Sequence, residues 1–113
     1  MDELLRKGIL LFNNCDFFQC HEVLEEAWTK EIGPSRLFLQ ALIHLAVGFY
    51  HCEGANPAGA SSQLKKGMHK LALYLPSCDG IDTARLRREA LAALERIEAG
   101  VTASIYPQIH THT

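Results

Sequence analysis

The sequence predicts an all-α protein, a single-domain bundle of about five antiparallel helices with the third helix at its centre. Two observations predict this class. Hydrophobic residues make up 48% of the 113 residues, and they are mostly strong helix formers such as Leu and Ala. Breaker residues divide the chain into five segments of helical length. Because the connections between these segments are short, consecutive helices should be antiparallel neighbours.

Each predicted helix is bounded by residues that start or stop helices. The five ranges are 2–13, 16–32, 35–53, 57–75 and 82–100. Asp16, Ser35 and Asp82 stand where an N-cap residue is expected, and Pro57 suits the first position of the fourth helix. These positions predict where four of the five helices begin.

The domain organisation follows from the same reading. Residues 1–100 are expected to form one helical bundle domain, because they carry all five helical segments. Residues 101–113 show no hydrophobic period and include Pro107, so they are expected to form an extended or disordered C-terminal tail.

Composition excludes several classes of function. The net charge is −2 and the pI is near 6.3, which argues against a nucleic-acid partner. The absence of an 18-residue apolar run argues against a membrane partner. The acidic start, Met1-Asp2-Glu3, does not resemble a secretory signal, so a cytoplasmic location is expected. Glycine-rich phosphate loops are also absent, and we expect no cofactor.

The third helix carries one narrow polar seam. At about 100° per residue, Arg36, Gln40, His44 and His51 fall within an arc of roughly 80°. The other positions of this helix are almost all apolar or small. A helix that is apolar nearly all round is buried, so this helix should be central and the seam should be its only polar side.

The second helix carries polar residues beside its apolar face. His21 and Glu25 lie four residues apart and therefore on one side. Glu22 points further out, and Trp28, the single tryptophan, ends the apolar face. If the second and third helices pack antiparallel, their polar flanks meet. The candidate polar pocket therefore consists of His21, Glu22, Glu25, Trp28, Arg36, Gln40 and His44.

A dozen residues in order resemble a known family, domain of unknown function 309. They include Asp16-Phe17-Phe18, His21-Glu22-Val23-Leu24-Glu25, Trp28, Arg36-x-Phe38-Leu39-Gln40 and Tyr50-His51, within residues 4–90. The resemblance implies a small all-helical cytoplasmic protein and directs attention to the candidate pocket. This chain departs from the family pattern at Cys15, where a Gly usually precedes the acidic residue, and at Ala41, where Gly is common.

Three interpretations of the candidate pocket stand side by side. In the first, it is a hydrogen-bonded structural lock in which Arg36 forks onto Glu25 or Glu22, with Gln40 and His44 completing the network. In the second, it binds an organic or anionic ligand. In the third, His21 and Glu25 hold a metal, although no established metal motif supports this and we predict no metal ligands.

Two functional hypotheses follow. The favoured one is a small helical binding or interaction module that takes a small polar ligand or a protein partner. The alternative is a small hydrolase-like enzyme in which His21 acts as acid or base and Glu25 orients it, with or without a metal. The surplus of apolar residues in small helices also raises the expectation of a homodimer.

Overall fold

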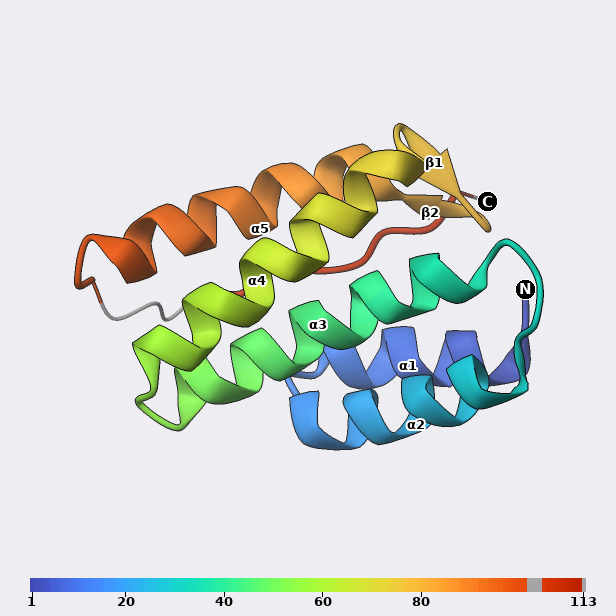
Figure 1. The fold of residues 1–113 in the computed structure, drawn as a ribbon, viewed down its shortest axis with the longest axis horizontal. Helices are drawn as coiled ribbons and strands as arrows, with labels where there is room; N and C mark the ends of the chain where they lie inside the picture. Colours follow the sequence, from blue (N-terminus) through green and yellow to red (C-terminus); the bar gives the residue numbers. More distant parts are fainter. Residues whose placement is uncertain (102–104, 113) are drawn as a thin grey trace.

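The computed structural model describes residues 1–101 and 105–112. Its helices, in the described residues, are α1 (Glu3–Asn13), α2 (Phe17–Lys30), α3 (Arg36–Glu53), α4 (Pro57–Leu71) and α5 (Thr83–Glu98), with a 3₁₀ turn, η1 (Ala72–Tyr74), after α4 (Figure 1). The predicted all-α class and the five helices are confirmed. Within the described ranges, no helix combines the length and apolar character needed to cross a membrane.

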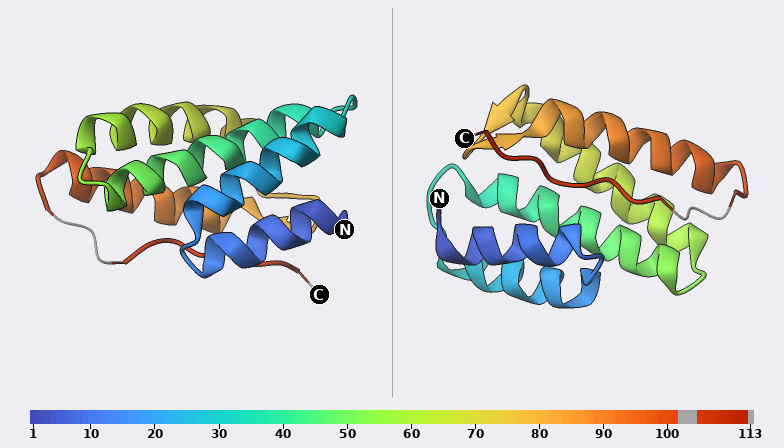
Figure 2. Two further views of the ribbon diagram at one scale, coloured as in Figure 1. Left: turned by 90° about the horizontal axis from the view of Figure 1, so that it is seen from below. Right: turned by 180° about the vertical axis from the view of Figure 1, so that it is seen from behind.

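The third helix, α3, lies at the centre of the bundle, as predicted. It packs against α2 on one side and α4 on the other, while α1 packs on α2 and α5 packs on α4. Figure 2 shows α2, α3 and α4 on one side of the molecule and α1 and α5 on the other. Nine of the 18 residues of α3 are buried, which accounts for its nearly continuous apolar sequence.

Two glycines allow α3 and α4 to approach closely. A Cβ on Gly67 would stand 3.0 Å from the backbone oxygen of Ala41, and one on Gly48 would stand 2.8 Å from the side chain of Leu64. A side chain at either position would force a neighbouring atom to shift, so both positions favour glycine. The close approach makes the α3–α4 pair a fixed platform for the residues along its outer side.

The tail runs as an extended segment along the side of the bundle that holds α1 and α5 (Figure 2). Asn13 holds the tail in place through two hydrogen bonds with Ile109. The Asn13 side-chain NH₂ donates to the Ile109 carbonyl at 3.0 Å, and the Asn13 side-chain oxygen accepts from the Ile109 backbone N–H at 2.7 Å. Ile109 is buried, and the Tyr106 ring packs edge-on against Phe17 and Phe49. Residues 102–104 and 113, to which the tail expectation also applies, lie outside the described residues.

A small hairpin was not predicted. Strands β1 (Ser77–Cys78) and β2 (Ile81–Asp82) pair antiparallel, and Ile81 bridges to Thr111 of the tail. The backbone amide of His112 also donates to the carbonyl of Gly80 at 2.7 Å. The tail therefore joins the hairpin as a third extended segment, and it fastens the C-terminal end of the described chain to the start of α5.

The predicted helix caps are confirmed in part. Asp82 caps α5 by accepting the Arg85 amide at 3.0 Å. Asp16 and Ser35 occupy the cap positions of α2 and α3, but neither side chain makes a capping hydrogen bond. The Ser35 hydroxyl instead donates to the Asp79 carboxylate at 3.2 Å. Ser35 therefore ties the start of α3 to the hairpin turn.

Candidate functional site

The Arg36 guanidinium lies over the indole ring of Trp28. The guanidinium carbon is 3.8 Å from the ring centroid, which is the geometry of a cation–π contact. The Nη1 atom donates to the carbonyl oxygens of Trp28 and Glu31, both at 2.9 Å. These carbonyls belong to the C-terminal end of α2, where backbone oxygens lack helical partners and favour a positive charge. Arg36, the first residue of α3, thus closes the end of α2.

The prediction that Arg36 bonds to the carboxylate of Glu22 or Glu25 is therefore wrong, because its partners are backbone carbonyls. Helix α2 ends at Lys30, so the carbonyls of its last turn lie close to the first residue of α3. Glu25 lies further back along α2 and is exposed. The Arg36 guanidinium therefore donates to the backbone carbonyls at the end of α2 and not to the carboxylate of Glu22 or Glu25.

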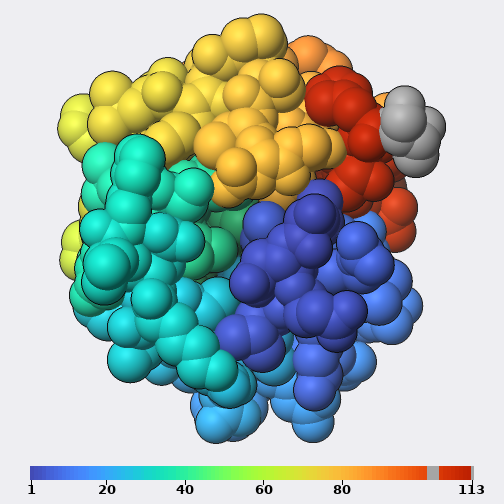
Figure 3. Space-filling model, turned by 90° about the vertical axis from the view of Figure 1, so that its right-hand side faces the viewer, coloured from blue at the N-terminus to red at the C-terminus, as the bar shows by residue number. Residues whose placement is uncertain are grey.

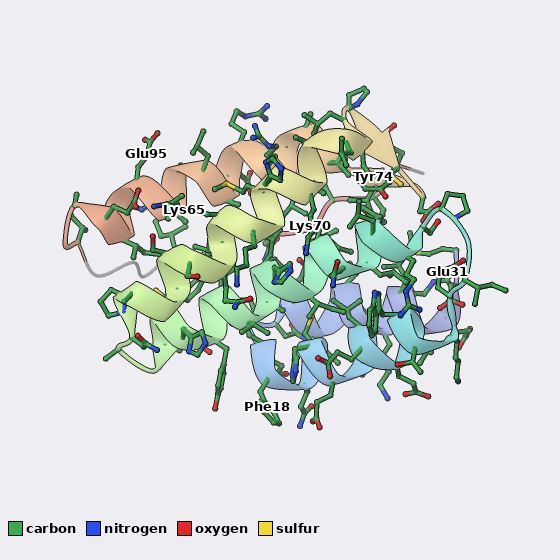
Figure 4. The ribbon with its side chains drawn as sticks, viewed as in Figure 1. Phe18, Glu31, Lys65, Lys70, Tyr74 and Glu95 are labelled. Atoms are coloured by element: carbon green, nitrogen blue, oxygen red, sulfur yellow. The ribbon has the colours of Figure 1, made fainter. Side chains whose placement is uncertain are left out.

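A shallow cleft of about 460 Å³ opens beside the Trp28–Arg36 stack. It is lined by Trp28, Gly33, Pro34, Arg36, Leu37, Gln40 and Tyr74. Three of the seven candidate residues thus share one cleft. Tyr74 was missed as a lining residue, because no pattern in the sequence predicts that η1 reaches α3. Figure 4 shows Tyr74 and Lys70 in line along the side of α4 and η1 that faces α3.

Several hydrogen-bond donors in this cleft have no acceptor among the described residues of the protein. Among the described residues, Arg36 donates through Nη1 alone, and neither the Trp28 indole N–H nor the Gln40 amide has a protein partner. Every buried side-chain nitrogen or oxygen in the described part of the chain does have a partner. Because all three residues are half-buried, their unused donors must therefore be open to solvent.

The His21 and Glu25 side chains form a pair on the surface of α2. His21 Nε2 lies 3.3 Å from a Glu25 carboxylate oxygen, and Nδ1 lies 3.1 Å from the Phe18 carbonyl oxygen. A neutral imidazole can donate to only one of these two acceptors. Both ring nitrogens therefore face groups of α2 itself. The neighbouring Glu22 is exposed.

His44, a residue of the same seam, bonds to side chains of α4. Its Nδ1 is 2.8 Å from the Gln63 side-chain oxygen, and the Lys70 ammonium donates to Nε2 at 2.7 Å. Burial lowers the pKa of the imidazole, the Gln63 hydrogen bond opposes this, and the charges of Lys70 and Lys66 add to the lowering. His44 is therefore held in its neutral form, with Nδ1 donating to Gln63 and Nε2 accepting from Lys70.

The basic residues of α4 and α5 are largely engaged within the protein. Lys65 pairs with Glu98 at 2.9 Å, and Arg85 pairs with Glu89 at 3.0 Å. Arg87 donates to the carbonyl of Met68 at 3.1 Å. Across residues 1–101 and 105–112, no three His, Cys, Asp or Glu side chains are grouped as metal ligands would be.

These features define a class: a small all-helical bundle whose central helix presents a polar seam, with a solvent-open cleft at one end of that seam. Residues 5–63, more than half of the 113-residue chain, match the family described as Domain of unknown function (DUF309). The chain belongs to this family, which confirms the resemblance found in the sequence. The matched segment contains α2 and α3 with all seven candidate residues.

Two relatives are similar over most of this chain. The chain is 33% identical over 97 residues to "Uncharacterized protein YpuF" of Bacillus subtilis. The aligned region covers 83% of this chain and 54% of that protein. It is 27% identical over 89 residues to an "Uncharacterized protein" of Aquifex aeolicus, which covers 75% of this chain and 26% of that one. The chain thus spans about half the length of the first relative and about a quarter of the second. Neither name assigns an activity.

Proposed function

We propose that this protein is a small binding module, and that the cleft beside the Trp28–Arg36 stack takes a ligand that carries a carboxylate on a short apolar group. The observation that carries the proposal is the set of unused, solvent-open donors on Trp28, Arg36 and Gln40 around one cleft. Donors that surround a concave surface fix the orientation of a ligand.

The chemistry of the lining selects the ligand class. A guanidinium matches the planar geometry of a carboxylate, and it keeps its charge at all physiological pH values. Stacking on Trp28 and bonding to two carbonyls hold the Arg36 side chain in place before a ligand arrives, which lowers the entropy cost of binding. The remaining walls, Pro34, Leu37 and Tyr74, offer apolar surface for the rest of the ligand.

The experiment is a titration with hexanoate, followed by intrinsic fluorescence. Trp28 is the single tryptophan, so the emission reports directly on the cleft. We expect a saturable change with a dissociation constant on the order of millimolar, because one ion pair and a short chain supply little binding energy. Hexanol, which has the same chain length and no charge, should leave the emission unchanged at equal concentration. No saturable response to hexanoate would refute the proposal.

Two variants separate the cleft from the overall charge. Gln40→Glu places a carboxylate four residues after Arg36 on α3, where it can pair with the guanidinium and repel an anion. This variant should remain folded and should lose the hexanoate response. Gln19→Glu makes the same change of charge about 14 Å away along α2 from Trp28, and it should respond as the original protein does. Equal loss in both variants would indicate a general charge effect instead.

The hydrolase alternative lacks a comparable observation. The ring nitrogens of His21 lie against the Phe18 carbonyl and the Glu25 carboxylate of α2 itself, and His21 is not among the residues that line the cleft beside Trp28. For this reason we favour binding over catalysis.

We also propose that the protein works in a reducing compartment such as the cytoplasm. Its four cysteines are all free thiols, which is the usual state in the cytosol.

A homodimer is a second proposal. Exposed Phe18 and Tyr50 lie 5.4 Å apart between ring centroids, on neighbouring helices, and would supply apolar surface to a second copy. Sedimentation over a range of protein concentrations would test it.

A further inference from the structure

A second cleft, larger than the one beside Trp28, opens at the end of the bundle where five separate segments meet. Its volume is about 630 Å³, within the range typical of small-molecule sites. Its walls come from Met1, Asp2, Leu4, Leu5, Ala27, Lys30, Glu31, Ser35, Leu39, Asp79, Gly80 and His112. Figure 3 shows this end of the molecule, hollowed between the N-terminal residues, the loop at residues 31–35 and the hairpin. We name it the end cleft.

The floor of the end cleft is apolar. Leu5, Ala27 and Leu39 are buried core residues of α1, α2 and α3 that reach this surface, and Leu4 packs beside them. The half-exposed Met1 side chain lines one wall, and its flexible thioether can adapt to different shapes. A ligand with a short apolar chain would therefore remove hydrocarbon surface from water here.

The rim of the end cleft is predominantly acidic. Asp2, Glu31 and Asp79 lie on it, against Lys30, the α-ammonium of Met1 and the imidazole of His112. The Lys30 ammonium is directed to the Glu26 carboxylate, at 3.3 Å. The Lys30 charge is therefore partly compensated outside the cleft, and the three carboxylates outnumber the remaining positive groups on the rim.

Each rim carboxylate has an oxygen to spare. Oδ1 of Asp2 caps α1, Oε1 of Glu31 accepts the Gly33 amide at 2.7 Å, and Oδ2 of Asp79 accepts the Ser35 hydroxyl at 3.2 Å. Within the described residues, the second oxygen of each has no hydrogen-bond partner. The bonds that are made hold the three carboxylates in place, and the spare oxygens offer acceptors to a donor.

From this combination we infer that the end cleft binds a small organic amine: an ammonium group at the Asp79 and Glu31 carboxylates, with a short alkyl chain over the leucine floor. An ammonium supplies three donors and a compact positive charge, which complements acceptors without protons of their own. The site is separate from the Trp28 cleft, which has the opposite charge preference and shares no lining residue with the end cleft.

The test uses hexylamine at pH 7, with hexanol and hexanoate as probes of the same chain length. Binding is followed by shifts of the leucine methyl signals in NMR spectra of the full chain, with no residues added before Met1. We expect hexylammonium to shift the methyl signals of Leu4, Leu5 and Leu39 in a saturable way, and to bind more tightly than either control probe. Equal or tighter binding of hexanol or hexanoate at Leu4, Leu5 and Leu39, or hexylammonium shifts confined to other leucines, would overturn the proposal.

Matched variants test the role of charge on the rim. Asp79 adopts a left-handed backbone conformation, φ 49°, which asparagine also tolerates. Asp79→Asn keeps an acceptor for Ser35 and should weaken hexylammonium binding about three- to fivefold. Glu31→Gln should act in the same direction. Glu95→Gln, at an exposed position on α5 that points away from the bundle in Figure 4, should not change binding. Equal weakening by all three variants would contradict the assignment to the end cleft.

Discussion

Replacing Arg36 by alanine is expected to lower the free energy of unfolding by about 2.5–3 kcal/mol. The Nη1 atom donates two hydrogen bonds of 2.9 Å to the carbonyls of Trp28 and Glu31. Each is expected to contribute about 1 kcal/mol, because the half-buried carbonyls regain some water when the side chain is removed. Stacking on the indole at 3.8 Å adds about 0.5–1 kcal/mol. Arg36→Lys should recover part of the loss, because an ammonium can serve one carbonyl but cannot stack as a plane.

The assay is urea unfolding followed by far-ultraviolet circular dichroism, so that Trp28 variants are measured in the same way. A double-mutant cycle with Trp28→Leu, which removes the aromatic ring, isolates the stacking, with an expected coupling energy of about 0.5–1 kcal/mol. Arg88→Ala is the control, since Arg88 is exposed, and should lie within about 0.5 kcal/mol of the original protein. If Arg36→Ala is as mild as the control, or if the coupling is zero, Arg36 does not close α2 in the way described.

Three further predictions follow from individual residues. Cys15 has a left-handed φ of 62°, so Cys15→Gly should stabilise the protein by about 0.5–1 kcal/mol in thermal unfolding, whereas Cys15→Ala should not. Burial raises the pKa of Cys20 to about 12, so a thiol reagent at pH 8 should label exposed Cys15 first and Cys20 only on unfolding; equal rates would contradict this. His44 has a lowered pKa in the folded protein, so the unfolded state binds more protons near the ordinary pKa of about 6.5. Its stabilising effect is therefore present above pH 6.5 and lost as the pH falls through the lower, folded value. Unfolding measured from pH 7.5 to pH 5 should show a smaller loss of stability in His44→Gln than in the original protein.

The helices could be predicted from the sequence because their signals are local. Asp82 and Pro57 mark the starts of α5 and α4, and the apolar sequence of α3 predicts its central place. The hairpin and the tail depend on contacts between distant residues, such as Asn13 with Ile109, 96 positions apart. No period or breaker in either segment records such a pairing. For this reason the sequence predicts no strand between the fourth and fifth helical segments, which end at residue 75 and begin at residue 82.

The sequence predicted which residues lie at the candidate site more closely than it predicted their hydrogen-bond partners. The wheel of α3 placed Arg36, Gln40 and His44 on one seam, and the structure keeps them on the half-buried side of that helix. Their partners depend on where α2 ends and on how α4 is rotated, and neither is encoded by spacing. Arg36 therefore binds carbonyls and not carboxylates, and His44 bonds to Gln63 and Lys70 of α4.

The most direct test of the proposed binding function is to observe the donors themselves. In ¹H–¹⁵N spectra, the Trp28 indole N–H and the Arg36 Nε–H each give a separate side-chain signal. If the cleft beside the Trp28–Arg36 stack binds carboxylates, both signals should shift together as hexanoate is added, with one dissociation constant, and neither should move in Gln40→Glu. If hexanoate leaves both signals in place while shifting signals elsewhere, or shifts nothing at all, the cleft is not a carboxylate site and the central claim is wrong.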